Sequence, residues 1–199
     1  MQCELLDSHP DYCRLSALPG IAVDLRYARA DNFVGYALYQ DIDCDWIHRE
    51  AAAGLLASAN WLKRHFPEYR ILVLDALRPN RIQVKLWDFL AGTNLRIYVA
   101  DPALGSIHSY GKAIDVTLID QHGIELDMGS DFDELNEKSH PVLEKQLLQN
   151  QQLSSHHLHN RGILRDAMAA GGFHGIRSEW WHFNHGDPAF VRASYLKIE

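Results

Sequence analysis

The chain is poor in cysteine and contains no closely spaced cysteine pair of the kind that holds a structural metal. Its three cysteines are Cys3, Cys13 and Cys44, all in the first quarter of the 199 residues, and no CxxC motif occurs. An odd and clustered set does not indicate a disulfide framework, and a chain of this length buries enough surface to fold without one. One disulfide between two of the three stays compatible with the sequence, although the low count favours a reducing compartment.

The sequence also lacks dense basic runs and long hydrophobic runs. It carries 19 basic and 26 acidic residues, a formal net charge of −7, which disfavours nucleic acid and anionic membranes as partners. No apolar run approaches the length of a membrane span, and the first residues have neither the basic nor the apolar region of a signal peptide. We therefore expect a cytoplasmic protein, or a periplasmic one if a leader has been removed. A homo-oligomer is compatible with this composition.

The order of the local patterns predicts a single α+β domain over residues 1–199, with a mainly antiparallel sheet flanked by helices. Hydrophobic residues make up 47% of the chain and charged residues 23%, as is usual for a globular protein. Strands are expected over residues 21–27, 70–77, 113–119 and 180–184. Helices are expected from Asp43 or Asp45 to about residue 66, and over residues 81–90, 139–152 and 160–170. Residues 1–20, 31–40 and 93–112 are expected to be irregular.

Local signals refine some of these boundaries. Pro79 biases Arg78 toward an extended conformation, which places Arg78 at the end of a strand, and Asn80 is expected to cap the helix that follows. His156, His157 and His159 form a polar stretch that we interpret as a solvated loop, without a second metal site.

Two short segments concentrate side chains that bind metals and transfer protons: SIHSYGKAID at residues 106–115 and EWWH at residues 179–182. Zinc is bound by imidazole and carboxylate when thiolates are absent, and a catalytic site uses three protein ligands and leaves one position open. His108, Asp115 and His182 would supply that set on the sheet. Gly111 lies between the first two, where the chain must turn.

Peptide hydrolysis also needs a group that takes a proton from water and gives one to the leaving amine. Glu179 is the candidate, but on a flat strand it would point away from His182, three residues later. Both can reach one metal only if the backbone bends near Trp180, which we predict. Arg78 is the candidate for stabilising an oxyanion, because a fixed guanidinium favours developing negative charge. Taken alone, Arg78 would be interpreted as an ordinary ion-pairing arginine.

The SxHxxGxAxD and ExxH segments resemble those of the D-alanyl-D-alanine dipeptidases, the VanX type, within the zinc D,D-peptidase superfamily. The resemblance runs over nearly the whole chain from about residue 20. Further segments that share it are DLRYA at 24–28, DNFVG at 31–35, LRP at 77–79, MGSDFD at 128–133, Ser139-His140, Asn160-Arg161 and Gly172-Phe173.

This resemblance implies one Zn²⁺ per chain on His108, Asp115 and His182, Glu179 as base and acid for the zinc-bound water, and Arg78 as transition-state stabiliser. It implies cleavage of the small dipeptide D-Ala-D-Ala to D-alanine. By position, Ser106, Tyr27 and Asp133 would bind the substrate, with Asp133 facing its ammonium group. The plainer interpretations are a turn serine, strand packing and a helix cap. Two other functions stay open: a D,D-carboxypeptidase of peptidoglycan stem peptides, and a non-catalytic zinc-binding domain of the same fold.

Overall fold

A five-stranded mixed sheet forms the centre of the molecule in the computed structural model, which describes residues 1–199. The strand order is β2-β4-β5-β7-β6, with β2 parallel to β4 and all other neighbours antiparallel. The strands are β2 Ala22–Val23, β4 Arg70–Asp75, β5 Ala113–Ile119, β6 Phe173–Gly175 and β7 His182–His185. The predicted α+β class and mainly antiparallel sheet are therefore confirmed.

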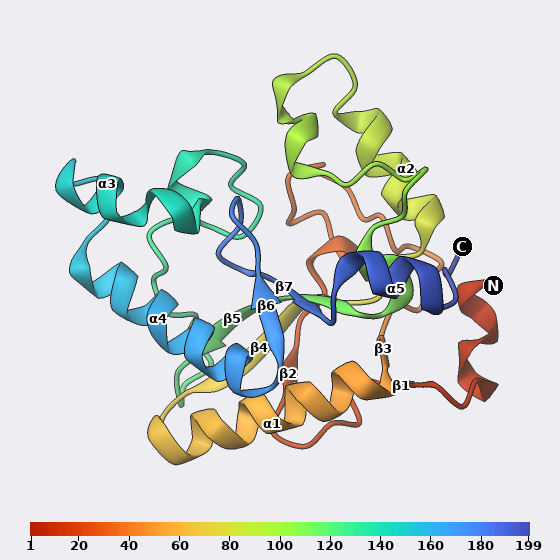
Figure 1. Cartoon of the computed structure of the whole chain (residues 1–199), viewed down its shortest axis with the longest axis horizontal. Coiled ribbons are helices and arrows are strands. Elements are labelled where there is room, and N and C mark those ends of the chain that lie inside the picture. The colour runs from red at the N-terminus through yellow and green to blue at the C-terminus, as the bar shows by residue number, and fades with distance from the viewer.

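Two helices, α1 (Arg49–His65) and α4 (Ser155–Ala170), pack together against the sheet (Figure 1). Their apolar sides share one core with alternate residues of the central strands, so the sheet has a helix-covered face. On β5 these residues are Ile114, Val116 and Leu118, all fully buried. Because side chains alternate along a strand, Asp115 and Thr117 lie on the opposite face.

The remaining helices surround that opposite face and the ends of the sheet (Figure 1). They are α2 Asn80–Phe89, α3 Glu144–Gln149 and α5 Pro188–Ser194. Short 3₁₀ helices are η1 Cys3–Ser8, η2 Arg26–Ala28, η3 Asn94–Tyr98, η4 Ile107–Tyr110, η5 Glu137–Ser139 and η6 Pro141–Leu143. The two termini lie side by side, since the Glu199 amide donates to the Met1 carbonyl at 2.7 Å. No helix is both long enough and apolar enough to cross a membrane.

The start of the chain was predicted to be irregular, and this prediction was wrong. β1 (Tyr12–Arg14) pairs antiparallel with β3 (Trp46–His48) in a separate two-stranded ribbon. This ribbon takes residues that the sequence analysis assigned to the first helix, so α1 starts only at Arg49. Its N-cap is His48 and not Asp43 or Asp45. Asp45 instead accepts hydrogen bonds from the amide and hydroxyl of Ser16. The pairing joins segments more than thirty residues apart, which local patterns do not reveal.

Helix α4 starts at Ser155, so the histidine-rich stretch lies in its first two turns rather than in a loop. Ser154 and His157 form a reciprocal capping box, with the Ser154 hydroxyl accepting from the His157 amide and the His157 ring accepting from the Ser154 amide. The other nitrogen of His157 contacts the Asp127 carboxylate at 3.1 Å. A histidine in place of the usual Glu or Gln at this position hid the helix start.

Other boundaries differ in smaller ways. The expected strand 21–27 is only two residues long, because η2 begins at Arg26. Asn80 is the first residue of α2 rather than its cap, and Pro79 occupies the cap position without a side-chain bond. The strand β6 was not predicted. Helix 139–152 is reduced to η6 and α3.

Candidate metal centre and surrounding cavity

Three side chains from distant parts of the chain bring one potential ligand atom each to a single point. His108 Nε2 lies 3.1 Å from His182 Nδ1 and 3.4 Å from Asp115 Oδ1, and His182 Nδ1 lies 3.0 Å from Asp115 Oδ1. A tetrahedral zinc ion keeps ligand atoms at roughly 2.0–2.1 Å from the metal, and hence roughly 3.3 Å from one another. The observed spacings match that requirement closely. The cluster is enclosed, since His108 and Asp115 are each 2% exposed.

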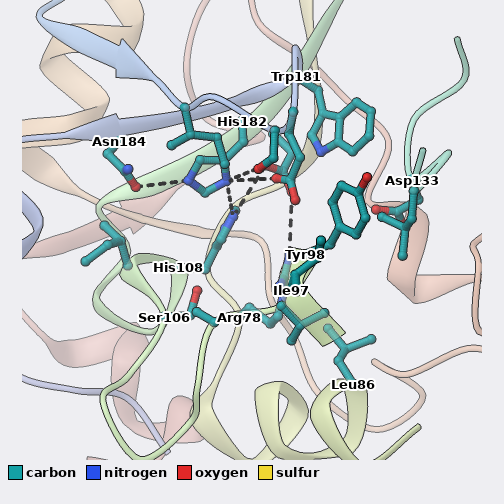
Figure 2. A pocket seen from close by; sticks show the side chains of 18 of the residues that line it. Arg78, Leu86, Ile97, Tyr98, Ser106, His108, Asp133, Trp181, His182 and Asn184 are labelled. Atoms are coloured by element: carbon teal, nitrogen blue, oxygen red, sulfur yellow. Dashed lines mark hydrogen bonds and ion pairs between the residues drawn. The ribbon is translucent and has the colours of Figure 1, made fainter. Parts of the chain in front are cut away.

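The outer nitrogens of the two imidazoles determine what the inner nitrogens offer. His108 Nδ1 donates to the Ala76 carbonyl at 2.7 Å. His182 Nε2 donates to the Asn184 side-chain oxygen at 3.0 Å, a contact drawn in Figure 2. With protons on the outer nitrogens, both inner nitrogens carry lone pairs. Two lone pairs and the Asp115 carboxylate then converge in a buried space, which is favourable only with a cation between them. The donor set therefore fits a divalent metal.

The sheet positions two of these residues. Asp115 of β5 and His182 of β7 are directly paired across neighbouring antiparallel strands. Residues paired in this way project from the same face with their Cβ atoms about 5 Å apart. His108 comes from η4, just before β5, and Gly111 ends this turn with φ of 64°. The turn predicted at Gly111 is thus present.

Glu179 reaches the cluster because the backbone bends at Trp180 and Trp181 before β7 begins, as the sequence predicted. Its Oε2 atom lies 3.9 Å from His182 Nδ1, and the residue is 8% exposed. Burial, aided by the nearby negative charges of Asp115 and Asp133, raises the pKa of Glu179 to about 8 when no metal is bound. A cation in the cluster would lower this pKa and favour the carboxylate.

Arg78 also borders the cluster, held by three side chains. Its Nε donates to Asp75 Oδ2 at 2.9 Å, its Nη1 donates to Gln83 Oε1 at 3.1 Å, and its Nη2 lies 3.4 Å from Asp115 Oδ2. The guanidinium lies over the Tyr27 ring, 5.0 Å from its centre. At 8% exposure this arginine is no surface residue. Its orientation is set from several sides, as a precisely aimed donor requires.

The sequence analysis did not identify Asp75 as part of this site, yet Asp75 holds the Arg78 guanidinium in place. It is completely buried and also accepts a hydrogen bond from the Tyr39 hydroxyl at 2.6 Å. A β-bulge in β4 places one extra residue between Val73 and Asp75, so Asp75 pairs with Asp115 and shares its face of the sheet. A regular strand would have placed Leu74 opposite Asp115. The only local signal was an acidic residue three positions before Arg78.

The candidate metal cluster lies in the wall of a cavity of about 270 Å³. Tyr27, Ser106 and Asp133, the predicted substrate contacts, all lie in its wall together with Arg78 and Glu179. Tyr27 is buried beside Arg78, and the Ser106 hydroxyl caps no backbone group although the residue precedes η4. Figure 2 shows Ser106 and Asp133 on opposite sides, with Arg78 and His108 between them.

Asp133 has two unusual features. Its backbone is left-handed, with φ of 61°, and its Oδ2 atom is buried without a hydrogen-bond partner. Burial raises the pKa of Asp133 to about 8, and the charge of Asp115 acts in the same direction. A carboxylate kept from water in this way would gain from a cationic partner. Asp133 starts no helix, so it is not a helix cap.

Two further contacts around the cavity join segments far apart in sequence. The Tyr98 hydroxyl and His140 Nε2 are 2.7 Å apart, which ties η3 to the turn before η6. Arg192 of α5 also lines the cavity, and its Nε donates to the Gly105 carbonyl at 2.9 Å. The sequence analysis did not identify Asn184, Tyr98 or Arg192 as residues of this site. Each acts through tertiary contacts that no motif marks.

A family model for the M15 peptidases, described as D-ala-D-ala dipeptidase, matches residues 13–199. A D-alanyl-D-alanine dipeptidase of Escherichia coli (strain K12) is 39% identical over 165 residues, which is 83% of this chain and 79% of that protein. A protein of the same name from Enterococcus faecalis (strain ATCC 700802 / V583) is 29% identical over 87% of this chain and 90% of its own length.

A solved structure shares the fold at low sequence identity. It is that of the LdcB LD-carboxypeptidase, matched with a TM-score of 0.51 over 92% of this chain and 72% of that chain, at 16% identity. This likeness supports the α+β architecture described above.

Proposed function

Because this chain belongs to the M15 peptidase family of D-Ala-D-Ala dipeptidases, we propose that it hydrolyses the dipeptide D-Ala-D-Ala to two molecules of D-alanine in a zinc-dependent reaction. One observation carries the proposal: a buried carboxylate, Glu179, lies 3.9 Å from His182 within a convergent set of metal-ligand atoms. A metal site needed only for folding would have no use for a second carboxylate held beside its three ligands.

In this proposal His108, Asp115 and His182 hold one Zn²⁺ per chain. Zinc, when bound, acts as a Lewis acid that polarises a carbonyl oxygen and makes water a stronger nucleophile at neutral pH. Glu179 accepts the proton of the attacking water and then donates it to the leaving nitrogen of the scissile peptide bond. A cation in the cluster keeps Glu179 in the carboxylate form that accepts this proton, while its burial makes the protonated form easier to reach than in an exposed glutamate.

Arg78 donates to the oxygen that becomes negatively charged in the tetrahedral transition state. Its anchoring by Asp75 and Gln83 means that no reorganisation is needed as charge develops. Asp133 pairs with the substrate ammonium, which satisfies its buried and unpartnered oxygen. Tyr27 and Ser106 complete the cavity wall beside the metal cluster. The cavity, at about 270 Å³, lies near the lower end of ligand sites and suits a dipeptide.

The experiment is to incubate the zinc-loaded protein with D-Ala-D-Ala and to measure free D-alanine, with L-Ala-L-Ala and Glu179→Ala as controls. Release specific to the D,D-dipeptide and dependent on Glu179 supports the proposal. Release only from a blocked pentapeptide would instead indicate a D,D-carboxypeptidase. No release from either, with zinc measured in the protein, would indicate a non-catalytic zinc-binding domain.

A further inference from the structure

A dipeptide substrate brings a second charge into the cavity, the carboxylate at its C-terminus, and the roles above leave this charge without a partner. The cavity wall contains three carboxylates, Asp115, Asp133 and Glu179, but only two guanidinium groups, those of Arg78 and Arg192. A substrate carboxylate buried beside three acidic groups needs a cation, since an unpaired ion in such a place is strongly unfavourable.

Arg78 is poorly suited to this second role. Its Nε and Nη2 atoms bind Asp75, its Nη1 binds Gln83, and its Nη2 also lies near Asp115. Two carboxylates already neutralise this guanidinium, so a third would gain little from it. The proposed oxyanion role needs only one remaining N–H donor of Arg78, whereas a carboxylate is best bound by two parallel donors.

Arg192 has the free donors that Arg78 lacks. It forms no ion pair, and its only hydrogen bond runs from Nε to the Gly105 carbonyl. This bond holds the side chain against the residue just before Ser106, and it leaves both terminal nitrogens available. The fork of these two nitrogens matches the geometry of a carboxylate. Gly105 itself is in the left-handed region, with φ of 82°, and a Cβ added there would lie 2.9 Å from the Tyr110 hydroxyl, so a larger residue at this position would disturb the turn that carries the accepting carbonyl.

The position of Arg192 fits the direction of the substrate. Ser106 and Asp133 lie on opposite sides of the cavity, with His108 between them (Figure 2). Arg192 is attached to the Ser106 side through Gly105. A dipeptide with its ammonium at Asp133 and its scissile carbonyl at the metal cluster therefore directs its carboxylate toward Ser106 and Arg192.

We infer that Arg192 binds the C-terminal carboxylate of the substrate, with the Ser106 hydroxyl as a second donor. This contact restricts the enzyme to dipeptides in which both the ammonium and the carboxylate are free. This inference rests on the proposed function. It assigns to the last helix of the chain the selection of substrate ends, while the chemistry remains with Glu179 and Arg78.

The test compares D-Ala-D-Ala with its C-terminal amide in the wild type, Arg192→Gln and Arg192→Lys. We expect Arg192→Gln to lower kcat/KM for the free acid by about tenfold to a hundredfold, mainly through KM, as for loss of one charged pair. The amide, which lacks the charge, should be hydrolysed by the wild type and by Arg192→Gln at similar low rates. Arg192→Lys should retain part of the preference for the acid, because it keeps the charge without the fork.

Arg70→Gln is the matched control, because Arg70 is exposed at the start of β4 and forms no side-chain ion pair. An equal loss for acid and amide in Arg192→Gln would show that Arg192 only supports the Gly105 loop, and would overturn the inference. A kcat/KM for the free acid that Arg192→Gln leaves at the wild-type value would overturn it as well. Binding of D-Ala-D-Ala to Glu179→Gln, measured by calorimetry with and without Arg192→Gln, gives a second readout and should weaken by the same factor. If the wild type hydrolyses neither substrate, the proposed function fails instead.

Discussion

Asp75 and Asp115 lie opposite each other on β4 and β5, and Nη2 of Arg78 lies 2.7 Å from the first carboxylate and 3.4 Å from the second. One of these carboxylates also belongs to the candidate metal cluster, so a single guanidinium links the metal site to the buried core. This link makes the orientation of Arg78 and the charge of Asp115 depend on each other.

Asp75→Asn should therefore damage both stability and turnover. The change keeps the shape of the side chain but leaves Arg78 with one fewer buried counter-charge, and we expect the free energy of unfolding to fall by about 3 kcal/mol. Turnover of the folded fraction should fall by at least about tenfold, because the guanidinium is less precisely oriented. Urea unfolding and steady-state kinetics measure the two effects. Asp88→Asn, an exposed change on α2, should alter neither, and wild-type kinetics in Asp75→Asn would contradict this account.

Replacement of Glu179 and of His108 should separate catalysis from metal binding. Glu179→Gln should lower kcat by about a hundredfold to ten-thousandfold, the usual contribution of a general acid–base group, while zinc remains bound. His108→Ala should lose both zinc and activity, because it removes one of three ligands. Metal content after dialysis, measured together with turnover, tests the pair. A zinc-free Glu179→Gln protein would show that Glu179 is a ligand and not the base.

The pair Glu50–Lys112 should make stability depend on pH in the acid range. The Lys112 ammonium is 2% exposed and donates to Glu50 Oε2 at 2.6 Å, as does the Tyr195 hydroxyl at 2.6 Å. These hydrogen bonds lower the pKa of Glu50 to about 2 in the folded protein. A depressed pKa stabilises the fold above the ordinary glutamate value, and this contribution is lost as pH falls from about 5 to about 2.

Glu50→Gln should therefore cost about 1–2 kcal/mol at pH 7, a value reduced for solvent screening because the Glu50 side chain is 55% exposed. The difference between wild type and variant should shrink as pH falls toward 2, where the wild-type carboxyl is itself protonated. Chemical unfolding at several pH values measures it. Glu68→Gln, an exposed glutamate without a partner, should show no such trend, and a constant difference across pH would refute the assignment.

Replacing each of two glycines by alanine should change the stability of the protein in opposite directions. Gly111 has φ of 64°, and an added Cβ would lie 2.9 Å from the Tyr12 ring and 3.0 Å from the His48 amide. Gly111→Ala should destabilise the protein by about 2 kcal/mol or more and weaken zinc binding, since the turn positions His108. Gly162 lies within α4 with open space around it, so Gly162→Ala should stabilise by about 0.5–1 kcal/mol. Thermal unfolding and zinc titration would show both, and a neutral Gly111→Ala would count against a strained turn.

Local sequence patterns predicted much of the central architecture. The alternation in residues 113–119 corresponds to β5, and the apolar run after Arg70 corresponds to β4. Pro79 correctly marked the boundary between an extended segment and α2. The bend at Trp180 followed from requiring that Glu179 and His182 reach one point. These features depend on neighbours within a few residues, which is the range that periodicity and turn chemistry describe.

Other features required contacts that the sequence does not display. The ribbon of β1 and β3 redefined the start of α1, because pairing between distant segments outweighed the capping signals of Asp43 and Asp45. The start of α4 was hidden because His157 takes the place of the usual acidic capping partner. In the first case a contact between distant segments decided the boundary, and in the second a local capping pair outside the usual pattern did.

The sequence by itself determined the chemistry available to this protein: two imidazoles and a carboxylate for a cation, a glutamate for proton transfer and an arginine before a proline. Only the tertiary structure decided that Asp75 belongs with them, because its place depends on one extra residue in β4. It also decided that Asn184 and Ala76 orient the imidazoles and that Arg192 reaches the cavity from the last helix. The physical reason is that residue type sets which bonds a side chain can form, whereas the register of strands and the packing of helices decide which partners come within reach.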